Sequence, residues 1–452
     1  MKLLVLKQKL LNLTKDKRSY EIQKNIVLSF LFKGISIIVS LVIVPLTLNY
    51  LNPTEYGVWL TLSSIMTWIN LFDIGLGNGL RNKLTEALTL GDIKKGQNLV
   101  STTFALLTII IGLFFVLYVI VSPFLDWSRI LNTTIESSDK LNQIVLVVLV
   151  FFCFQFVFKT VGTVFISDQK PAANDFMGAI SSILSLLTIS LLTKFTQGSL
   201  LYVAIVFSAL PSLVFFVTYL IVFNSKYKPL KPGYKTIDWG NTKGLMNLGV
   251  QFFILQIGGI VLYFTSNIIV AQVFSPYEVT VYNIAYKYSN IISMVCLIII
   301  TPLWSAATEA FHLKDWQWFK SVEKKMLRLY IVITIGSVLL IMLSNWFYQL
   351  WIGTSIQIPF TLTVTMIIYN LLFVLSSIYI YMLNGIGKIR LQLWSSVIEI
   401  AITVPLCVIL AKQIGIEGVA IGMIIMISFR TIWAPIQFKK IITEKAIGIW
   451  NK

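Results

Sequence analysis

Twelve apolar segments, each long enough to cross a membrane, constrain the fold of this chain more than any other feature. Hydrophobic residues account for 57% of its 452 residues and charged residues for only 12%, too few charges to cover a water-soluble surface. A helix needs about 20 apolar residues to cross the roughly 30 Å hydrocarbon core of a bilayer. The sequence therefore predicts an all-α polytopic membrane protein with twelve transmembrane helices. The expected spans are 26–50, 55–77, 98–122, 141–167, 175–194 and 200–223 in the first half, and 245–271, 277–303, 327–351, 359–384, 391–411 and 416–436 in the second.

A block of sequence from the first half returns 223 residues later in the second half. Pro53-Thr54-Glu55 matches Pro276-Tyr277-Glu278, and Thr85-Glu86-Ala87 matches Thr308-Glu309-Ala310. The matches fall at the edges of corresponding apolar segments, which indicates one structural unit used twice. Repeated membrane halves are typical of transporters.

The even number of spans in each half predicts how the two halves are related. Six spans return the chain to its starting side, so both halves enter the membrane in the same sense. We therefore expect two six-helix lobes related by a pseudo-two-fold axis along the membrane normal. The expected organisation is a basic tail or interfacial helix over 1–25, an N-lobe over 26–223, a linker over 224–244, a C-lobe over 245–436 and a tail over 437–452.

The net charge of +17 follows a topological pattern. Of the 36 basic residues, 28 lie in the terminal tails and in alternate connections, whereas the opposite connections hold only Arg129, Lys140, Lys194 and Lys412. By the positive-inside rule, both termini are expected to be cytoplasmic. This distribution argues against nucleic acid as a partner.

Cysteine and histidine are too sparse for a metal site. Cys153, Cys296 and Cys407 lie in separate apolar runs and His312 is the single histidine. The cysteines are expected to be small buried hydrophobic residues, so no disulfide, metal or cofactor is predicted.

Four basic residues fall inside the predicted spans, where a cation costs at least roughly 2.5–3.5 kcal/mol on insertion scales. Lys287 lies deepest and shares a helical face with Asn283 and Asn290. We expect this polar stripe to line an aqueous cavity; the alternative is a lysine hydrogen-bonded between helices for packing.

The other three cations lie nearer the ends of their spans. Lys33 and Lys159 are cavity candidates, but each could also snorkel to the interface. Arg430 is expected to be an interfacial anchor. In the span 245–271, Gln256 and Asn267 suit hydrogen bonding to sugars or to neighbouring helices.

Two acidic residues are candidates for ion coupling. Asp73 lies at the end of one predicted span and Glu399 lies inside another. Burial makes a carboxylate easier to protonate, so either could carry a coupling proton or bind sodium. The alternatives are pairing of Asp73 with Arg81 at a turn, or pairing of Glu399 with a lysine.

Two motifs in the first half resemble a known family. They are Asn52-Pro53-Thr54-Glu55-Tyr56-Gly57-Val58-Trp59 and Phe72-Asp73-Ile74-Gly75-Leu76-Gly77-Asn78-Gly79-Leu80-Arg81-Asn82-Lys83. They are similar to the polysaccharide-transporter (O-antigen flippase, Wzx-type) family of the multidrug/oligosaccharidyl-lipid/polysaccharide exporter superfamily. The resemblance implies a V-shaped pair of lobes around a cationic central cavity, in the bacterial inner membrane. It also implies that a glycan on undecaprenyl diphosphate is turned from the cytoplasmic to the outer leaflet.

The resemblance and the lysines favour a flippase that is not an enzyme. Its expected partners are the lipid-linked glycan, membrane lipid and, from the family, a polymerase and a chain-length regulator. A drug/cation antiporter of the same superfamily is the first alternative, although it would need acidic residues at the midplane. A membrane polymerase or ligase is the second, although the longest outer connection here is short and poor in catalytic groups.

Overall fold

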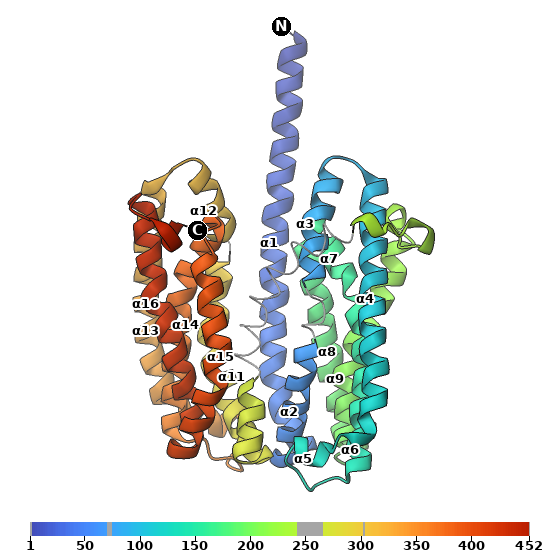
Figure 1. The fold of residues 1–452 in the computed structure, drawn as a ribbon, viewed down its shortest axis with the longest axis vertical. Coiled ribbons are helices and arrows are strands. Elements are labelled where there is room, and N and C mark those ends of the chain that lie inside the picture. Colours follow the sequence, from blue (N-terminus) through green and yellow to red (C-terminus); the bar gives the residue numbers. More distant parts are fainter. Residues whose placement is uncertain (1, 70–74, 242–264, 302, 452) are drawn as a thin grey trace. The chain divides into compact units, whose positions relative to one another are not determined.

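The computed structural model describes residues 2–69, 75–241, 265–301 and 303–451. Every regular element in these ranges is a helix (Figure 1), which confirms the predicted all-α class. The described residues contain ten helical segments that are long and apolar enough to cross a bilayer. The count of twelve stays a prediction, because α2 (Pro53–Ile69) is only 17 residues long and most of the expected span 245–271 lies outside the described residues.

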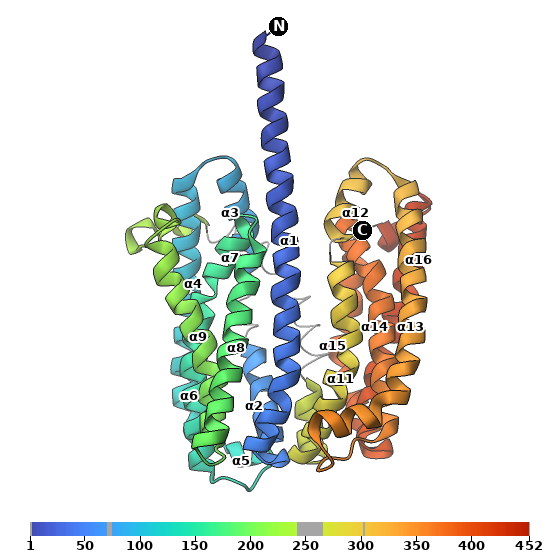
Figure 2. The ribbon, with the colours of Figure 1, turned by 180° about the vertical axis from the view of Figure 1, so that it is seen from behind.

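Contacts between helices divide the described chain into two compact units. The first unit holds the described parts of 1–50, 70–125 and 139–253. Within it, α8 packs against both α1 and α9, while α3 packs against α4 and α7 (Figures 1 and 2). Its helices are α1 (Lys2–Tyr50), α3 (Leu76–Thr89), α4 (Ile93–Val121), α6 (Ser138–Phe158), α7 (Thr160–Ser167), α8 (Pro171–Phe195) and α9 (Leu200–Phe223), with 3-10 turns at Ser122–Phe124, Lys228–Leu230, Tyr234–Thr236 and Trp239–Asn241.

The second unit holds the described parts of 51–69, 126–138 and 254–452. Helix α14 lies at its centre and packs against α11, α12, α13 and α16, while α15 packs against α16. Its helices are α2, α5 (Trp127–Ile130), α11 (Pro276–Ile300), α12 (Leu303–His312), α13 (Trp316–Ile352), α14 (Phe360–Ile386), α15 (Arg390–Ile414) and α16 (Glu417–Ile442), with a 3-10 turn at Gly448–Asn451. Residues 265–273 are also helical.

Helix α2 belongs to the second unit although it comes early in the chain. The sequence assigns it to the N-lobe at 26–223, whereas the structure packs it against α11. The expected lobes at 26–223 and 245–436, and the axis relating them, stay predictions.

The contact between α2 and α11 joins the two copies of the repeated motif. A Cβ atom added at Gly57 would lie 1.6 Å from the carbonyl oxygen of Pro276. Thr280, 223 residues after Gly57, donates its hydroxyl to the carbonyl oxygen of Pro53 at 2.6 Å. Each helix therefore contacts the proline at the start of the other through the same position of the repeat, which is the pattern of a two-fold contact.

The helix caps repeat at the same offset. The side chain of Asn52 accepts from the backbone N–H of Glu55, and Ser275 accepts in the same way from Glu278. Asp92 and Asp315 likewise accept from backbone N–H groups three residues later, at the starts of α4 and α13. Such caps satisfy N–H groups that the first helical turn leaves unpaired. The structure thus confirms the repeat at these positions.

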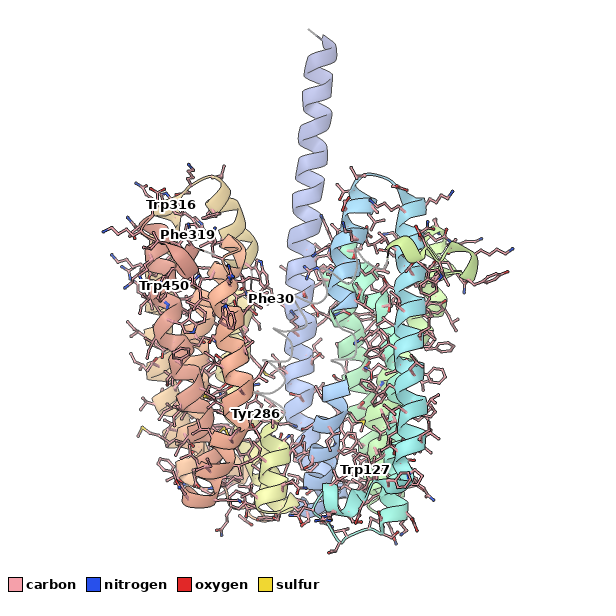
Figure 3. The ribbon with its side chains drawn as sticks, viewed as in Figure 1. Phe30, Trp127, Tyr286, Trp316, Phe319 and Trp450 are labelled. Atoms are coloured by element: carbon pink, nitrogen blue, oxygen red, sulfur yellow. The ribbon has the colours of Figure 1, made fainter. Side chains whose placement is uncertain are left out.

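Aromatic side chains gather at one end of the second unit. The ring centres of Trp316 and Phe319 lie 6.0 Å apart, and those of Phe319 and Phe438 lie 5.9 Å apart. Trp450 lies nearby in Figure 3, with the ammonium of Lys440 4.1 Å from its ring centre. The C-terminal turn is therefore attached to α16.

Candidate functional site

The first unit contains a half-open cavity of ≈ 270 Å³, and a lysine borders it. Lys159 interrupts the expected span 141–167, which forms two helices, α6 and α7, on either side of it. The Lys159 ammonium lies 4.4 Å from the centre of the Phe156 ring, a cation–π distance. The lining residues are Gly77, Thr103, Leu107, Lys159, Thr160, Thr163, Ile166, Asn174 and Phe215.

A buried hydroxyl in this cavity has no hydrogen-bond partner among the described residues. Thr103 is fully buried, and its Oγ1 makes no hydrogen bond within the part of the chain that the structure describes. Asn174 reaches the cavity from α8 because Gly162 lacks a side chain; a Cβ at Gly162 would lie 2.1 Å from Asn174 Oδ1. A cation, an unpaired hydroxyl and an amide therefore border one space, and their chemistry suits an anion with several oxygens.

A second cavity, of ≈ 180 Å³, lies inside the second unit between α2, residues 265–273, α11 and α16. Asn283 Nδ2 donates to Asn267 Oδ1 at 2.5 Å, and Asn267 Nδ2 donates to Ser64 Oγ at 2.7 Å. Tyr286, labelled on α11 in Figure 3, also borders this space. The lining residues are Leu60, Ser63, Ser64, Thr67, Ser266, Asn267, Tyr282, Asn283, Tyr286 and Met423. These polar side chains are all neutral amides or hydroxyls.

Lys287 lies one turn beyond Asn283 on α11 and contacts α2. Its Nζ donates to the Tyr56 hydroxyl at 3.2 Å and lies 6.0 Å from the centre of that ring. The Lys287 and Asn290 side chains are both half-buried. The structure thus keeps Asn283, Lys287 and Asn290 on one helix, with Asn283 in the cavity and Lys287 hydrogen-bonded to a tyrosine.

Lys33 has an acidic partner that the sequence analysis missed. Its Nζ lies 3.8 Å from Asp175 Oδ2, and the Ser29 hydroxyl donates to the same carboxylate oxygen. The pair joins α1 to α8 inside the first unit, and the Lys33 side chain is 53% exposed. Asp175 is the first residue of a predicted span, which is the one sequence signal that could have drawn attention to it.

Glu399 pairs with Arg430 between α15 and α16. The Arg430 guanidinium donates to both carboxylate oxygens, through Nε at 3.2 Å and through Nη2. Ser395 Oγ also donates to Glu399, and Trp433 Nε1 donates to Ser395 Oγ. Glu399 is 1% exposed, so its charge is buried and bidentately paired. From the sequence we expected Arg430 to be an anchor at the membrane interface. The alternative partner considered for Glu399 was a lysine.

Gln256 and Asp73 lie outside the described residues. Their roles stay predictions.

A charged cluster lies beyond the ends of the membrane spans in the first unit. Asp168 accepts hydrogen bonds from Lys170 and Tyr227, and Lys226 lies 3.8 Å away. Burial by itself raises the pKa of the Asp168 carboxyl, but these hydrogen bonds and the two lysine charges hold that pKa below its usual value. Burial and the bond to Asp168 raise the pKa of Tyr227 to about 12.

The fold and the two cavities define a class: a multi-pass helical membrane protein with polar spaces inside its helical units. The fold is similar to that of MATE family multidrug resistance transporters of the MOP superfamily. With one such transporter, solved facing inward, the TM-score is 0.75 at 14% identity, over 93% of this chain and 100% of the other. With one solved facing outward, it is 0.65 at 16% identity, over 94% and 97%. At these identities the likeness shows the fold alone.

The family follows from the sequence comparison. Residues 22–306 match the family described as polysaccharide biosynthesis proteins, and the chain belongs to that family. A Yersinia pseudotuberculosis protein named as an O-antigen export protein is 24% identical over 90% of this chain and 93% of its own length. A Salmonella typhi protein named as an O-antigen transporter is 21% identical over 91% and 94%. The resemblance to the Wzx-type polysaccharide transporters is thereby confirmed.

Proposed function

We propose that this protein exports a polysaccharide precursor by flipping undecaprenyl-diphosphate-linked oligosaccharide repeat units across the bacterial cytoplasmic membrane. Membership of the family and the names of the two relatives support export of a polysaccharide such as O-antigen or capsule. In this proposal both termini are cytoplasmic, in keeping with the distribution of basic residues.

The observation that carries the proposal is the cavity beside Lys159. A diphosphate presents several anionic oxygens, and a lysine ammonium in a partly desolvated space stabilises such charge more strongly than it does in water. Thr103 supplies a buried hydroxyl that has no partner in the described ranges of the chain, and Thr163 and Asn174 add polar atoms to the same lining. The polyprenyl tail would stay in lipid while the charged head occupies the protein.

Ion-coupled alternating access is the proposed mechanism. Lys287 would contribute positive charge to binding of the head group, as would Lys33 once its pair with Asp175 opens, and Gln256 would add a neutral hydrogen-bonding group. Glu399 and Asp73 are the proposed coupling residues. Because Arg430 holds Glu399 in a buried ion pair, coupling through Glu399 would require that pair to open during the cycle.

A drug/cation antiporter of the same superfamily is the second candidate, since the similar solved folds are multidrug transporters. A cationic drug needs an acidic partner in its site. The cavity beside Lys159 and the cavity beside Asn283 are lined by one lysine and otherwise neutral groups, which favours an anionic substrate. Both relatives carry transporter names, which favours transport over a polymerase or ligase reaction.

Deletion of the gene, followed by mass analysis of the lipid extract, tests this function. We expect lipid-linked repeat units to accumulate and surface glycan to be lost, with both effects reversed by the wild-type chain. Lys159→Ala should fail to reverse them, and Lys159→Arg should reverse them in part. Normal surface glycan in the deletion strain, without accumulated intermediates, would contradict the proposal.

A further inference from the structure

We propose that the ≈ 180 Å³ cavity in the second unit binds one sugar residue of the exported glycan and so contributes to glycan selectivity. This inference rests on the proposed function, because it assigns a second subsite to the same lipid-linked substrate. The site lies between α2, residues 265–273, α11 and α16.

The lining chemistry matches a sugar better than it matches an ion. Two asparagines, two tyrosines and four serine or threonine hydroxyls supply neutral donors and acceptors. No acidic or basic side chain lines the cavity within the described residues, so a phosphate has no cationic partner there and a cationic drug has no carboxylate. Neutral hydrogen-bonding groups and tyrosine rings complement the hydroxyls and the apolar faces of a pyranose.

The size of the cavity fits a single ring. A cavity of about 150 Å³ accepts a benzene molecule, so ≈ 180 Å³ has room for about one six-membered ring with few substituents. An oligosaccharide would therefore place one residue here and leave the others outside.

Hydrogen bonds fix part of the lining and leave two groups available to a ligand. Asn283 uses Nδ2 to bind Asn267, which in turn binds Ser64, so both amide planes are held in place. Asn283 Oδ1 and the Tyr286 hydroxyl have no hydrogen-bond partner among the described residues. These two residues are three apart on α11 and therefore share a helical face. An acceptor and a donor held on one face can bind adjacent sugar hydroxyls.

Selectivity follows from the cost of leaving such groups unpaired. A site that hydrogen-bonds a substrate hydroxyl discriminates strongly against an analogue that lacks it, because a buried polar group then loses its partner. A glycan whose sugar has the wrong hydroxyl pattern would leave Asn283 or Tyr286 without a hydrogen-bond partner in this cavity and would bind there more weakly.

The test compares binding of the full-length purified protein in lipid nanodiscs to two probes. One is the lipid-linked intermediate purified from the deletion strain, and the other is undecaprenyl diphosphate without sugar. We expect the wild type to bind the glycan-bearing lipid more tightly than the bare carrier. Asn283→Ala and Tyr286→Phe should each weaken binding of the glycan-bearing lipid about two- to tenfold, the range for one neutral hydrogen bond, and leave the bare carrier unaffected.

Two controls separate this inference from the proposed function. Tyr348→Phe removes a buried hydroxyl that bonds Thr363 elsewhere in the same unit, and it should leave both affinities unchanged. Lys159→Ala should weaken both probes equally. If the wild type binds neither probe, the proposed function itself fails. If both lipids bind but Asn283→Ala and Tyr286→Phe affect neither, or weaken both lipids equally, the sugar subsite is refuted while the flippase assignment stands.

Discussion

Arg430 of α16 and Glu399 of α15 neutralise each other in the interior of the second unit. Both carboxylate oxygens of Glu399 accept from the guanidinium, and Ser395 adds a third hydrogen bond. Glu399 itself is only 1% exposed. The pair therefore joins two neighbouring helices where solvent does not screen the charges.

Removing one partner should cost more stability than removing both. Arg430→Ala leaves an uncompensated buried charge, which typically costs about 3–5 kcal/mol, whereas the double variant with Glu399→Ala removes that charge as well. Thermal unfolding in detergent should show the single variant melting below the double. An Arg430→Ala protein as stable as the wild type would show that the pair contributes nothing.

Transport by Glu399→Gln tests whether this carboxylate also carries the coupling ion. The amide cannot exchange a proton, so transport driven by an imposed inward cation gradient in proteoliposomes should fall well below that of the wild type. Transport without a gradient measures the loss that comes from disturbed packing alone. Undiminished gradient-driven transport would remove Glu399 from coupling.

Lys287→Ala should abolish export while protein levels stay normal, because it removes the positive charge beside Tyr56. Lys287→Arg keeps the charge and should restore export in part. Tyr56→Phe keeps the ring but loses the acceptor hydroxyl, and should cause a smaller loss. The measurements are surface glycan and membrane protein levels in the complemented deletion strain. Wild-type glycan levels with Lys287→Ala would exclude Lys287 from the mechanism.

Gly57→Ala should destabilise the second unit, because its Cβ would lie 1.6 Å from the carbonyl oxygen of Pro276. Separating two packed helices to admit a methyl group typically costs about 1–3 kcal/mol. Gly178→Ala is the matched control, since no atom lies within 4 Å of the added Cβ there. Equal melting temperatures for the two variants would show that α2 and α11 can accommodate the added methyl group without loss of stability.

The Asp168 cluster predicts a pH dependence of stability. Because the folded-state pKa of Asp168 lies below its usual value, the carboxylate stabilises the fold above the unfolded pKa of about 3.9, and this stabilisation is lost as pH falls through the folded pKa. Asp168→Asn should therefore melt below the wild type at pH 7, and the difference should shrink below about pH 4. A difference independent of pH would show that charge plays no part.

Hydrophobic patterning predicted the helical class and several element boundaries. The expected span 200–223 coincides with α9, and the stripe containing Asn283 and Lys287 does lie on one helix, α11. These features depend on local sequence, which fixes both helix period and helix ends.

The partners of the charged residues depend on tertiary packing and were not predictable in the same way. Lys33 and Asp175 are 142 residues apart, and Glu399 and Arg430 are 31 apart. The second pair offered a signal, since each is an embedded charge in one of two consecutive predicted spans. The break between α6 and α7 at Lys159 had no such sequence signal, because the residues directly on either side of it are compatible with a continuous helix.

The reciprocal packing of Gly57 and Thr280 on each other's motif prolines has a consequence for how a duplicated chain can arise. Because both sides of the contact come from the same position of the repeat, a half-length chain could form it with a second copy of itself. A homodimeric ancestor would therefore need no new contact surface when its gene was duplicated and the two copies fused.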